Sequence, residues 1–314
     1  NAQQAAEAMQ SGSNVTTVQA DSEQVQKAKV KLNLILVTTY DIIDAERHMA
    51  AVTLEAGKDY WYRVGTDGQY GALWSEPVLL RGDTDADGFS FISVADSQGS
   101  TESDYAHYNN VLAQAQQTFP DAAFVTHLGD MVDDGINENY WSWVLDTDEM
   151  QSMPVLPVAG NHEARSEKGD LPNALQAHYN LNIPEQDDST GIYYSYEYKN
   201  ATFIVLNTND GDNAIGEAQL KWAEGVAASA DTDWLIVLAH KAPYSKGPHG
   251  DESDVLALRS TLDTFCAEYG VDLVLSGHDH TYLRTPFLSH GEEVDNSSNT
   301  TTIEKDGVTY QQTT

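Results

Sequence analysis

The sequence predicts a layered α/β domain in which two sheets pack face to face, preceded by an all-β segment. From Phe89 onward, short apolar strands alternate with segments of helical periodicity, which is typical of an α/β domain. Several of these strands end in a polar residue of a type that binds metal ions. Before Phe89, the chain contains short strand candidates separated by turn signals, which indicates an all-β module.

Residues 1–82 show the pattern of a β-sandwich. Residues 59–65 alternate aromatic and polar side chains, as a half-buried strand does. The first twenty residues are rich in Gln, Ala and Ser, which indicates that the chain begins partway into this module or that its first strand is poorly formed. Residues 83–88 are rich in Gly and Asp and are expected to be a linker. The strand candidates are residues 15–18, 28–37, 48–54, 60–65 and 78–81.

The remaining residues, 89–314, are expected to form the α/β domain. Residues 192–198 and 202–206 have the pattern of a hairpin. The last strand candidate, residues 307–311, runs to the end of the chain, so we expect the domain to lack a C-terminal piece. The segments with helical periodicity are residues 102–118, 171–179, 215–230 and 255–269.

The charge is the most unusual bulk property, because 16 basic residues stand against 49 acidic ones and give a net charge of −33. Such a charge opposes general binding to nucleic acid or to an anionic membrane. No apolar stretch approaches the roughly 18 to 20 residues that span a bilayer. The chain starts at Asn1 without an apolar leader, so any signal peptide has been removed or is not included, and we expect a secreted or cell-surface bacterial protein. The single Cys266 allows no internal disulfide and is expected to lie in the core.

Five apolar strands each present a possible metal ligand at the carboxyl end. A single Gly-Asp pair is an ordinary turn, so one occurrence means little. Residues at the carboxyl ends of strands in an α/β sheet converge on one crevice, however, and five occurrences predict a metal site there. The possible ligands are Asp96, Asp130, Asn161, His240, His278 and His280.

These residues belong to blocks that resemble the five sequence blocks of the calcineurin-like metallophosphoesterases. The N-terminal segment resembles a fibronectin type III domain in residues 60–65 and 74–76. With residues 240–245 and 277–284, it makes the chain most similar to the purple acid phosphatase branch. The resemblance implies a four-layer αββα sandwich that holds two metal ions. The blocks are Asp96-x-Gln98, Gly129-Asp130-x-x-Asp133, Gly160-Asn161-His162-Glu163, His240 and Gly277-His278-x-His280.

The resemblance also implies a role for each residue. Asp130 would bridge the two ions, and Asp96 and His280 would hold the first ion. The second ion would be held by Asn161, His240 and His278. Oxygen and imidazole donors of this kind suit Fe, Mn or Zn. A water between two such ions becomes a hydroxide that attacks phosphorus. His162 would protonate the leaving group or hold a phosphate oxygen.

Two positions depart from the family pattern. Purple acid phosphatases have a Tyr three residues after the bridging Asp, where this chain has Asp133, so the protein should not be purple. Other metallophosphoesterases have a His two residues after the first Asp, where this chain has Gln98. We expect the carboxamide oxygen of Gln98 to bind the first ion, and we expect Asp133 to support the ligands rather than to bind metal.

The predicted function is metal-dependent hydrolysis of a small phosphomonoester. The alternatives are a phosphodiesterase that uses the same site and a non-catalytic cell-surface binding module. Substrate choice is expected to depend on loops such as residues 185–190 and 245–253. Lys241 and Arg284 are candidates to neutralise substrate phosphate, and Glu163 is a candidate to orient His162. The remaining histidines are expected to serve packing or to lie on the surface: His48, His107, His127, His178, His249 and His290.

Overall fold

The structure is a computed structural model that describes residues 1–12, 14–33, 38–68, 71–82, 88–164, 174–181, 183–184, 192–210, 214–295, 300–305 and 308–313. Several sequence-based predictions fall outside these ranges. They are the linker apart from Gly88, the first part of the helix expected at residues 171–179, and the loop at residues 185–190. No helix within the described ranges is long and apolar enough to cross a membrane.

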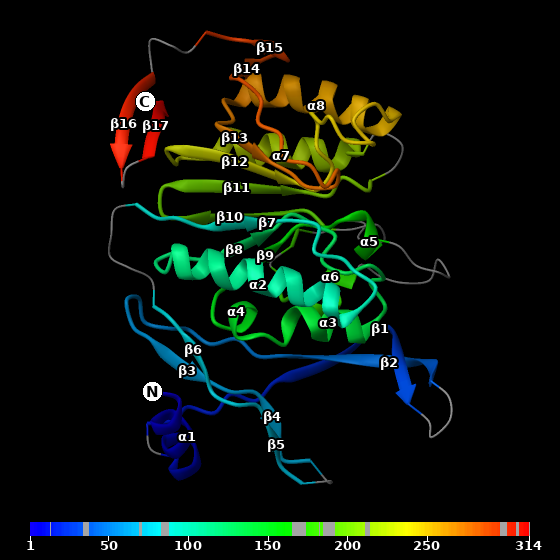
Figure 1. Cartoon of the computed structure of the whole chain (residues 1–314), viewed down its shortest axis with the longest axis vertical. Coiled ribbons are helices and arrows are strands. Elements are labelled where there is room, and N and C mark those ends of the chain that lie inside the picture. Colours follow the sequence, from blue (N-terminus) through cyan, green and yellow to red (C-terminus); the bar gives the residue numbers. More distant parts are fainter. Residues whose placement is uncertain are drawn as a thin grey trace.

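Two sheets pack face to face and helices cover both outer faces, which gives the expected four-layer αββα arrangement (Figure 1). One sheet consists of the parallel strands β7 (Ile92–Val94), β8 (Val125–His127) and β9 (Val155–Pro157). The other has the order β10 (Tyr194–Tyr198), β11 (Ala201–Leu206), β12 (Trp234–Ala239), β13 (Leu273–Leu275). Helices α2 (Glu102–Thr118), α3 (Glu138–Leu145) and α4 (Asp148–Gln151) cover the first sheet, and α7 (Glu217–Ser229) and α8 (Ser253–Tyr269) cover the second.

The register of the parallel strands places their carboxyl ends at one edge. Val94 pairs with His127, and His127 pairs with Pro157 in the first sheet. In the second sheet, Leu206 pairs with Ala239. The expected hairpin is confirmed, because β10 and β11 are antiparallel neighbours. The short helices α5 (Asn161–Ala164) and α6 (Ala174–His178) lie near the carboxyl ends of the strands (Figure 1).

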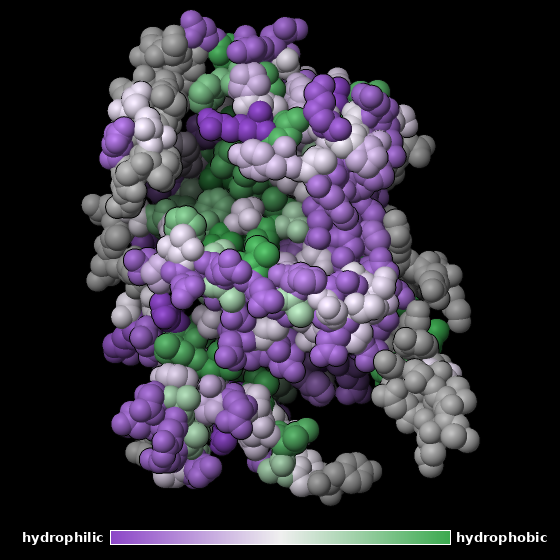
Figure 2. Space-filling model, in the orientation of Figure 1, coloured by the Kyte–Doolittle hydropathy of each residue, from purple (hydrophilic) through white to green (hydrophobic). Residues whose placement is uncertain are grey.

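The hydrophobic core has two parts, one on each side of the second sheet. Between the two sheets, aromatic rings meet edge to face, as Phe91 and Phe124 of one sheet do with Phe203 of the other. On the outer face of the second sheet, Val237 packs with Leu258 and Leu262 of α8. Figure 2 shows that the surface over the helices is mostly hydrophilic, with apolar residues visible at the level of the strands. Burial of these apolar faces is the main driving force that holds the four layers together.

The N-terminal segment differs in part from the predicted β-sandwich. It begins with helix α1 (Ala2–Ser11), in which the Asn1 side chain accepts a hydrogen bond from the backbone N–H of Gln4. Ala and Gln favour helices and Asn is a good cap, so the expectation of an all-β start is wrong here. The strand expected at residues 15–18 is also absent from the described structure.

The strands that follow form three two-stranded antiparallel sheets within the described residues. These pairs are β1 (Asp21–Asn33) with β2 (Thr38–Met49), β3 (Tyr60–Tyr62) with β6 (Val78–Leu80), and β4 (Gly65–Thr66) with β5 (Leu73–Trp74). The β1–β2 hairpin lies beside α3 (Figure 1). Tyr62 donates a hydrogen bond to the carbonyl oxygen of Gln151 at 2.8 Å, so the segment is attached to the α/β part.

Beyond β13, the chain forms two small hairpins. They consist of β14 (Leu288–Ser289) with β15 (Glu292–Glu293) and β16 (Thr300–Lys305) with β17 (Val308–Thr313). The strand expected at residues 307–311 corresponds to β17.

Candidate metal centre

The loops that follow the parallel strands remain joined by backbone hydrogen bonds. The N–H of Asp96 donates to the carbonyl oxygen of Gly129 at 3.0 Å, and the N–H of Gln98 donates to that of Asp130 at 3.0 Å. In the other sheet, the N–H of Gly277 donates to the carbonyl oxygen of His240 at 2.9 Å. These bonds extend the sheets beyond the strands and place the expected ligands on a rigid frame.

Four of the expected ligands adopt a left-handed backbone conformation. The φ angles are 56° at Asp96, 53° at Asp130, 77° at His278 and 51° at His280. A positive φ is uncommon for a residue with a Cβ atom and costs free energy, so its recurrence at one place indicates a functional constraint. The sharp turns direct these side chains away from the strands and toward the space between the loops.

Glycines next to the ligands allow the loops to approach closely. A Cβ atom on Gly160 would lie 2.1 Å from the backbone nitrogen of Asp130, and one on Gly129 would lie 2.5 Å from Nδ1 of His240. Such distances are far below van der Waals contact, so only glycine fits. The Gly-Asp and Gly-Asn pairs of the sequence therefore reflect close packing between neighbouring loops.

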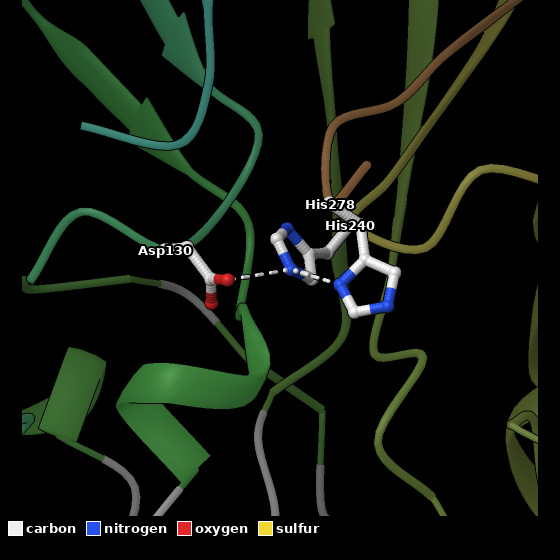
Figure 3. A group of neighbouring side chains, drawn as sticks. All are labelled: Asp130, His240 and His278. Carbon is white, nitrogen blue, oxygen red and sulfur yellow. Dashed lines mark hydrogen bonds and ion pairs between the residues drawn. The ribbon is translucent and has the colours of Figure 1, made fainter. Parts of the chain in front are cut away.

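Four donor atoms converge on one point between the sheets. Around Nε2 of His240 lie Oδ2 of Asp130 at 3.1 Å, Oδ1 of Asn161 at 3.1 Å and Nδ1 of His278 at 3.2 Å. Figure 3 shows Asp130 on one side of this point, facing His240 and His278 on the other. Asp130 and His240 are buried, with 2% and 0% of their side chains exposed.

This group of atoms has too few hydrogens for its contacts. A carboxylate and an amide oxygen only accept, and His240 can donate at most one hydrogen through Nε2. Ligands about 2.1 Å from a shared cation lie about 3.0 Å apart in octahedral and about 3.4 Å apart in tetrahedral geometry. The observed separations fall in this range, so the donor set fits a metal ion.

A second group of donors lies beside the first. Nε2 of His280 is 3.9 Å from Oδ1 of Asp96, and the amide of Gln98 is 3.0 Å from the same imidazole nitrogen. The amide of Gln98 is best oriented with its nitrogen toward the backbone carbonyls of Asp96 and Asp130, at 3.1 Å and 3.0 Å. Its oxygen then faces Nε2 of His280, which is the orientation that a metal ligand requires.

The electrostatics of the site favour a positive charge. Burial raises the pKa of Asp96. Burial opposes ionisation of Asp130, but the hydrogen bond and charge of His240 outweigh it and lower the pKa of that carboxyl. Burial likewise opposes protonation of His240, but the Asp130 carboxylate raises its pKa. Burial and the charge of His240 lower the pKa of His278 to about 4. The carboxylate of Asp130 therefore favours a positive charge at this point of the site.

His162 lies at the border of this site. Its Nδ1 is 2.8 Å from the backbone carbonyl oxygen of Asp133, and its Nε2 is 3.8 Å from Oδ2 of Asp130. The Asp133 carboxylate lies 3.3 Å from Nδ1 of His162, so it faces this imidazole.

Two further candidates point elsewhere. Lys241 forms an ion pair with Asp254. The Glu163 carboxylate accepts hydrogen bonds from backbone N–H groups, including that of Asp130 at 2.9 Å, and does not contact the His162 imidazole in any hydrogen bond of the described residues. Burial and the charge of Asp130 raise the pKa of Glu163 to about 7.

Two of the histidines that were expected to serve packing or to lie on the surface are close to the site. His127 is fully buried, as expected, and its Nε2 is 2.9 Å from Oγ of Ser97. Ser97 donates to the carbonyl oxygen of Met131 at 2.9 Å, so it accepts from Nε2–H of His127. His249 packs its ring against His278 with centroids 4.4 Å apart, which the sequence interpretation missed. Its only sequence signal is its place in the loop at residues 245–253, which was expected to influence substrate choice.

The fold and this arrangement of donors define a metallophosphoesterase. The chain belongs to the calcineurin-like phosphoesterase family, whose sequence model matches residues 89–282. It is also related to purple acid phosphatases. Purple acid phosphatase 18 of Arabidopsis thaliana is 28% identical over 145 residues, which cover 44% of this chain and 32% of that protein. A probable inactive purple acid phosphatase 1 of the same plant is 26% identical over 255 residues, which cover 72% of this chain and 41% of that protein.

Further similarities are to a bacterial protein sequence and to two solved structures. An uncharacterized protein of Mycobacterium tuberculosis is 29% identical over 150 residues, or 42% of this chain and 28% of that protein. The structure of a purple acid phosphatase from yellow lupin seeds superposes with a TM-score of 0.58 at 20% identity, covering 83% of this chain and 53% of that one. The structure of PhoD superposes with a TM-score of 0.53 at 15% identity, covering 84% and 65%. The matched segments thus span less than half of the curated relatives named here.

Proposed function

We propose that this protein is a metal-dependent phosphoesterase that hydrolyses phosphomonoesters. The observation that carries the proposal is the convergence of Asp130, Asn161 and His278 on Nε2 of His240, at 3.1 to 3.2 Å. In the reaction, water adds to phosphorus and the bond from phosphorus to the ester oxygen breaks. The alcohol leaves with a proton, and orthophosphate remains.

The chain offers donors for two ions. One group is made of Asp130, Asn161, His240 and His278, and the other of Asp96, Gln98 and His280. Ions such as Fe, Mn or Zn, when bound, would offset the negative charge of the phosphate and lower the pKa of water. Since the chain carries a net charge of −33, a phosphate group needs such local positive charge to bind.

His162 is the proposed proton donor or phosphate contact. The carbonyl oxygen of Asp133, 2.8 Å from Nδ1, accepts the hydrogen on that nitrogen and fixes the ring. The other ring nitrogen, Nε2, then faces the site and lies 3.8 Å from Oδ2 of Asp130. In the protonated ring, Nε2–H is the group placed to pass its proton to the leaving oxygen or to donate to a phosphate oxygen, and Nδ1–H stays hydrogen-bonded to Asp133.

Hydrolysis of p-nitrophenyl phosphate and bis(p-nitrophenyl) phosphate, measured with Mn, Fe or Zn added to chelator-treated protein, tests the proposal. The monoester should be hydrolysed with the higher kcat/KM. The Asp130→Asn variant should lose at least about 100-fold in kcat and should hold less metal by elemental analysis. Asp233→Asn is a matched control, because Asp233 lies at the opposite end of β12 and contacts Asn200.

The outcomes separate the alternatives. Faster hydrolysis of the diester would make the protein a phosphodiesterase. A folded protein that binds metal but hydrolyses neither ester would be a binding module. Metal binding has a second readout, since an ion that binds only the folded state raises the melting temperature and chelation lowers it.

We also propose that residues 1–82 form a fibronectin type III-like module, which residues 83–88 join to the phosphoesterase domain at residues 89–314. We further propose that the protein is secreted or lies at the cell surface of a bacterium. Support for the module comes from the antiparallel pairing of β3 with β6 and from the guanidinium of Arg63 stacked 4.7 Å from the Trp74 ring. Limited proteolysis should cut first within residues 83–88 and release two folded fragments. A first cut elsewhere would contradict this division.

A further inference from the structure

A pocket lies between the helices that follow the first two strands of the first sheet. Its volume is about 240 Å³. One wall comes from the start of α2 and the other from the start of α3, and neither wall includes an expected metal ligand. The lining residues are Ser100, Thr101, Glu102, Asn137, Asn139, Tyr140 and Trp143.

The pocket is close to the candidate metal centre along two paths. Ser100 follows Gln98 by two residues, so their Cα atoms are at most about 7 Å apart. On the other side, the hydroxyl of Tyr105 accepts a hydrogen bond from the backbone N–H of Asp133 at 3.3 Å. The Tyr105 ring packs against Tyr140 at 5.8 Å and Trp143 at 5.7 Å between ring centroids. Tyr105 therefore links the aromatic wall of the pocket to Asp133, whose carbonyl oxygen contacts His162.

The lining combines aromatic surface with uncharged polar groups. Asn137 is almost fully buried, with 3% exposed, and its side-chain oxygen accepts from Asn139. In the part of the chain that the structure describes, the hydroxyl of Ser100 and the indole N–H of Trp143 have no hydrogen-bonding partner. Aromatic faces with hydroxyl and carboxamide groups suit a ligand that carries both apolar surface and hydroxyl groups.

The charge of the pocket limits further which ligands can bind there. Apart from Tyr140, Glu102 is the one ionisable residue among the described residues that line the pocket. The chain as a whole is also strongly acidic. A second phosphate group in this pocket would meet a carboxylate without a lining Lys or Arg to neutralise it. The volume is also smaller than the roughly 300 to 1,000 Å³ of pockets for drug-sized ligands, so a compact group fits.

We propose that this pocket binds the monosaccharide part of a sugar monophosphate while its phosphate lies at the metal centre. The inference rests on the proposed phosphoesterase function and adds the substrate class. The sugar ring lies against Trp143, and its hydroxyl groups exchange hydrogen bonds with the side chains of Ser100 and Asn139. Glu102 disfavours substrates that carry a second phosphate group.

Kinetics with two substrates test the pocket separately from the chemistry. We compare kcat/KM for glucose 6-phosphate with that for p-nitrophenyl phosphate in the wild-type protein and in Trp143→Ala. The ratio should fall about 10-fold in the variant, mainly through a higher KM for the sugar phosphate, which corresponds to the loss of about one good contact. Trp143→Phe keeps a ring and should restore most of the ratio. Trp234→Ala is the matched control, because Trp234 is 49% exposed at the opposite end of the strands, and should leave the ratio unchanged.

Glu102→Gln provides a second variant on an exposed position, which avoids any loss of folding through the core. It should raise the ratio of kcat/KM for glucose 1,6-bisphosphate to kcat/KM for glucose 6-phosphate about 5-fold, and an unchanged ratio would contradict the role given to Glu102. Binding of glucose itself, followed by saturation-transfer NMR, supplies a readout without catalysis and should disappear in Trp143→Ala.

The outcomes distinguish the two levels of the proposal. If neither phosphate ester is hydrolysed with any metal, the proposed function fails, and the NMR result alone decides whether the pocket binds a sugar. If p-nitrophenyl phosphate is hydrolysed but the substrate ratio is the same in Trp143→Ala and in the wild type, the pocket proposal is overturned. Equal NMR signals from glucose with both proteins would overturn it as well.

Discussion

The carboxylate of Glu163 accepts a hydrogen bond from the backbone N–H of Asp130 at 2.9 Å. The same oxygen accepts from the N–H of Gly160 at 2.9 Å, and the other carboxylate oxygen accepts from Val132 at 3.1 Å. Glu163 is 2% exposed. A single buried side chain therefore joins the loop that presents Asp130 to the loop that presents Asn161.

Removal of the Glu163 carboxylate should destabilise the folded protein. Glu163→Ala leaves three backbone N–H groups without an acceptor, and we expect the free energy of unfolding to fall by about 3 kcal/mol or more. Glu163→Gln retains one acceptor oxygen and should lose less. Urea unfolding followed by circular dichroism measures both values. Equal stability of Glu163→Ala and Glu163→Gln would show that the hydrogen bonds are not what matters.

The hydroxyl of Ser97 links the loop that follows β7 to the loop that follows β8, through its hydrogen bonds with His127 and Met131. Ser97→Ala leaves Nε2–H of His127 and the carbonyl oxygen of Met131 buried without a partner, so the free energy of unfolding should fall by about 1 to 3 kcal/mol. The control Ser229→Ala removes a hydroxyl from an exposed position on α7, where its hydrogen bond to the carbonyl oxygen of Val226 is exposed, and should cost about 0.5 kcal/mol or less. A loss for Ser97→Ala no larger than that for Ser229→Ala would contradict the proposed link.

The ion pair between Lys241 and Asp254 contributes to the free energy of unfolding in a pH-dependent way. Burial opposes ionisation of Asp254, but the hydrogen bond and charge of Lys241 outweigh it and lower the pKa of the carboxyl below its usual 3.8. The stabilisation is therefore present above the unfolded-state pKa and is lost as the pH falls through the lower folded-state value. Asp254→Asn should lower the urea midpoint at pH 7, and the difference from the wild type should shrink below about pH 4. Asp251→Asn, at a nearby exposed position, should show no such change.

Cys266 should be unreactive in the folded protein. Burial, followed by the charge of Asp263, raises the pKa of its thiol from 9.0 to about 12. At pH 8 this lowers the thiolate fraction about 1,000-fold, and the thiolate is the nucleophile. Alkylation by iodoacetamide, followed by mass spectrometry, should be slow in buffer and fast in urea. The neutral thiol favours folding below the unfolded-state pKa, and this contribution is lost as the pH rises toward 12. Equal labelling rates in both solvents would contradict the assigned burial.

The sequence predicted the helices that have strong local signals. The bounds expected for α2, residues 102–118, agree with the structure, since Thr101 and Asp104 form a capping box at its start. Helix α3 was not predicted, because it is short and depends on tertiary contacts such as the hydrogen bond from Trp141 Nε1 to the carbonyl oxygen of Gly135 at 2.9 Å. Helix α1 follows from local signals, the Asn1 cap, the Ala and Gln that favour helices and Gly12 at its C-terminal end, whereas the fibronectin-like pattern of residues 60–65 predicts strands.

The candidate site was predictable to the extent that strand ends carry its residues. Asp130, Asn161 and His278 were expected to converge with His240, and their donor atoms lie 3.1 to 3.2 Å from its Nε2. The position of His249 beside His278 was not predictable, because it depends on how a loop folds back over another loop. The backbone N–H of His249 donates to the Asp279 carboxylate at 2.9 Å, a contact between residues 30 positions apart.

The left-handed backbone at Asp96, Asp130, His278 and His280 limits which amino acids these positions can hold, independently of metal chemistry. Asp, Asn and His tolerate such a conformation better than most residues, whereas β-branched residues are strained in it. Among variants at these positions, exchanges between Asp, Asn and His should therefore retain the fold and activity more often than exchanges to Thr or Val, even where the side chains are similar in size. The choice of donor is restricted twice, once by the cation and once by the turn that carries it.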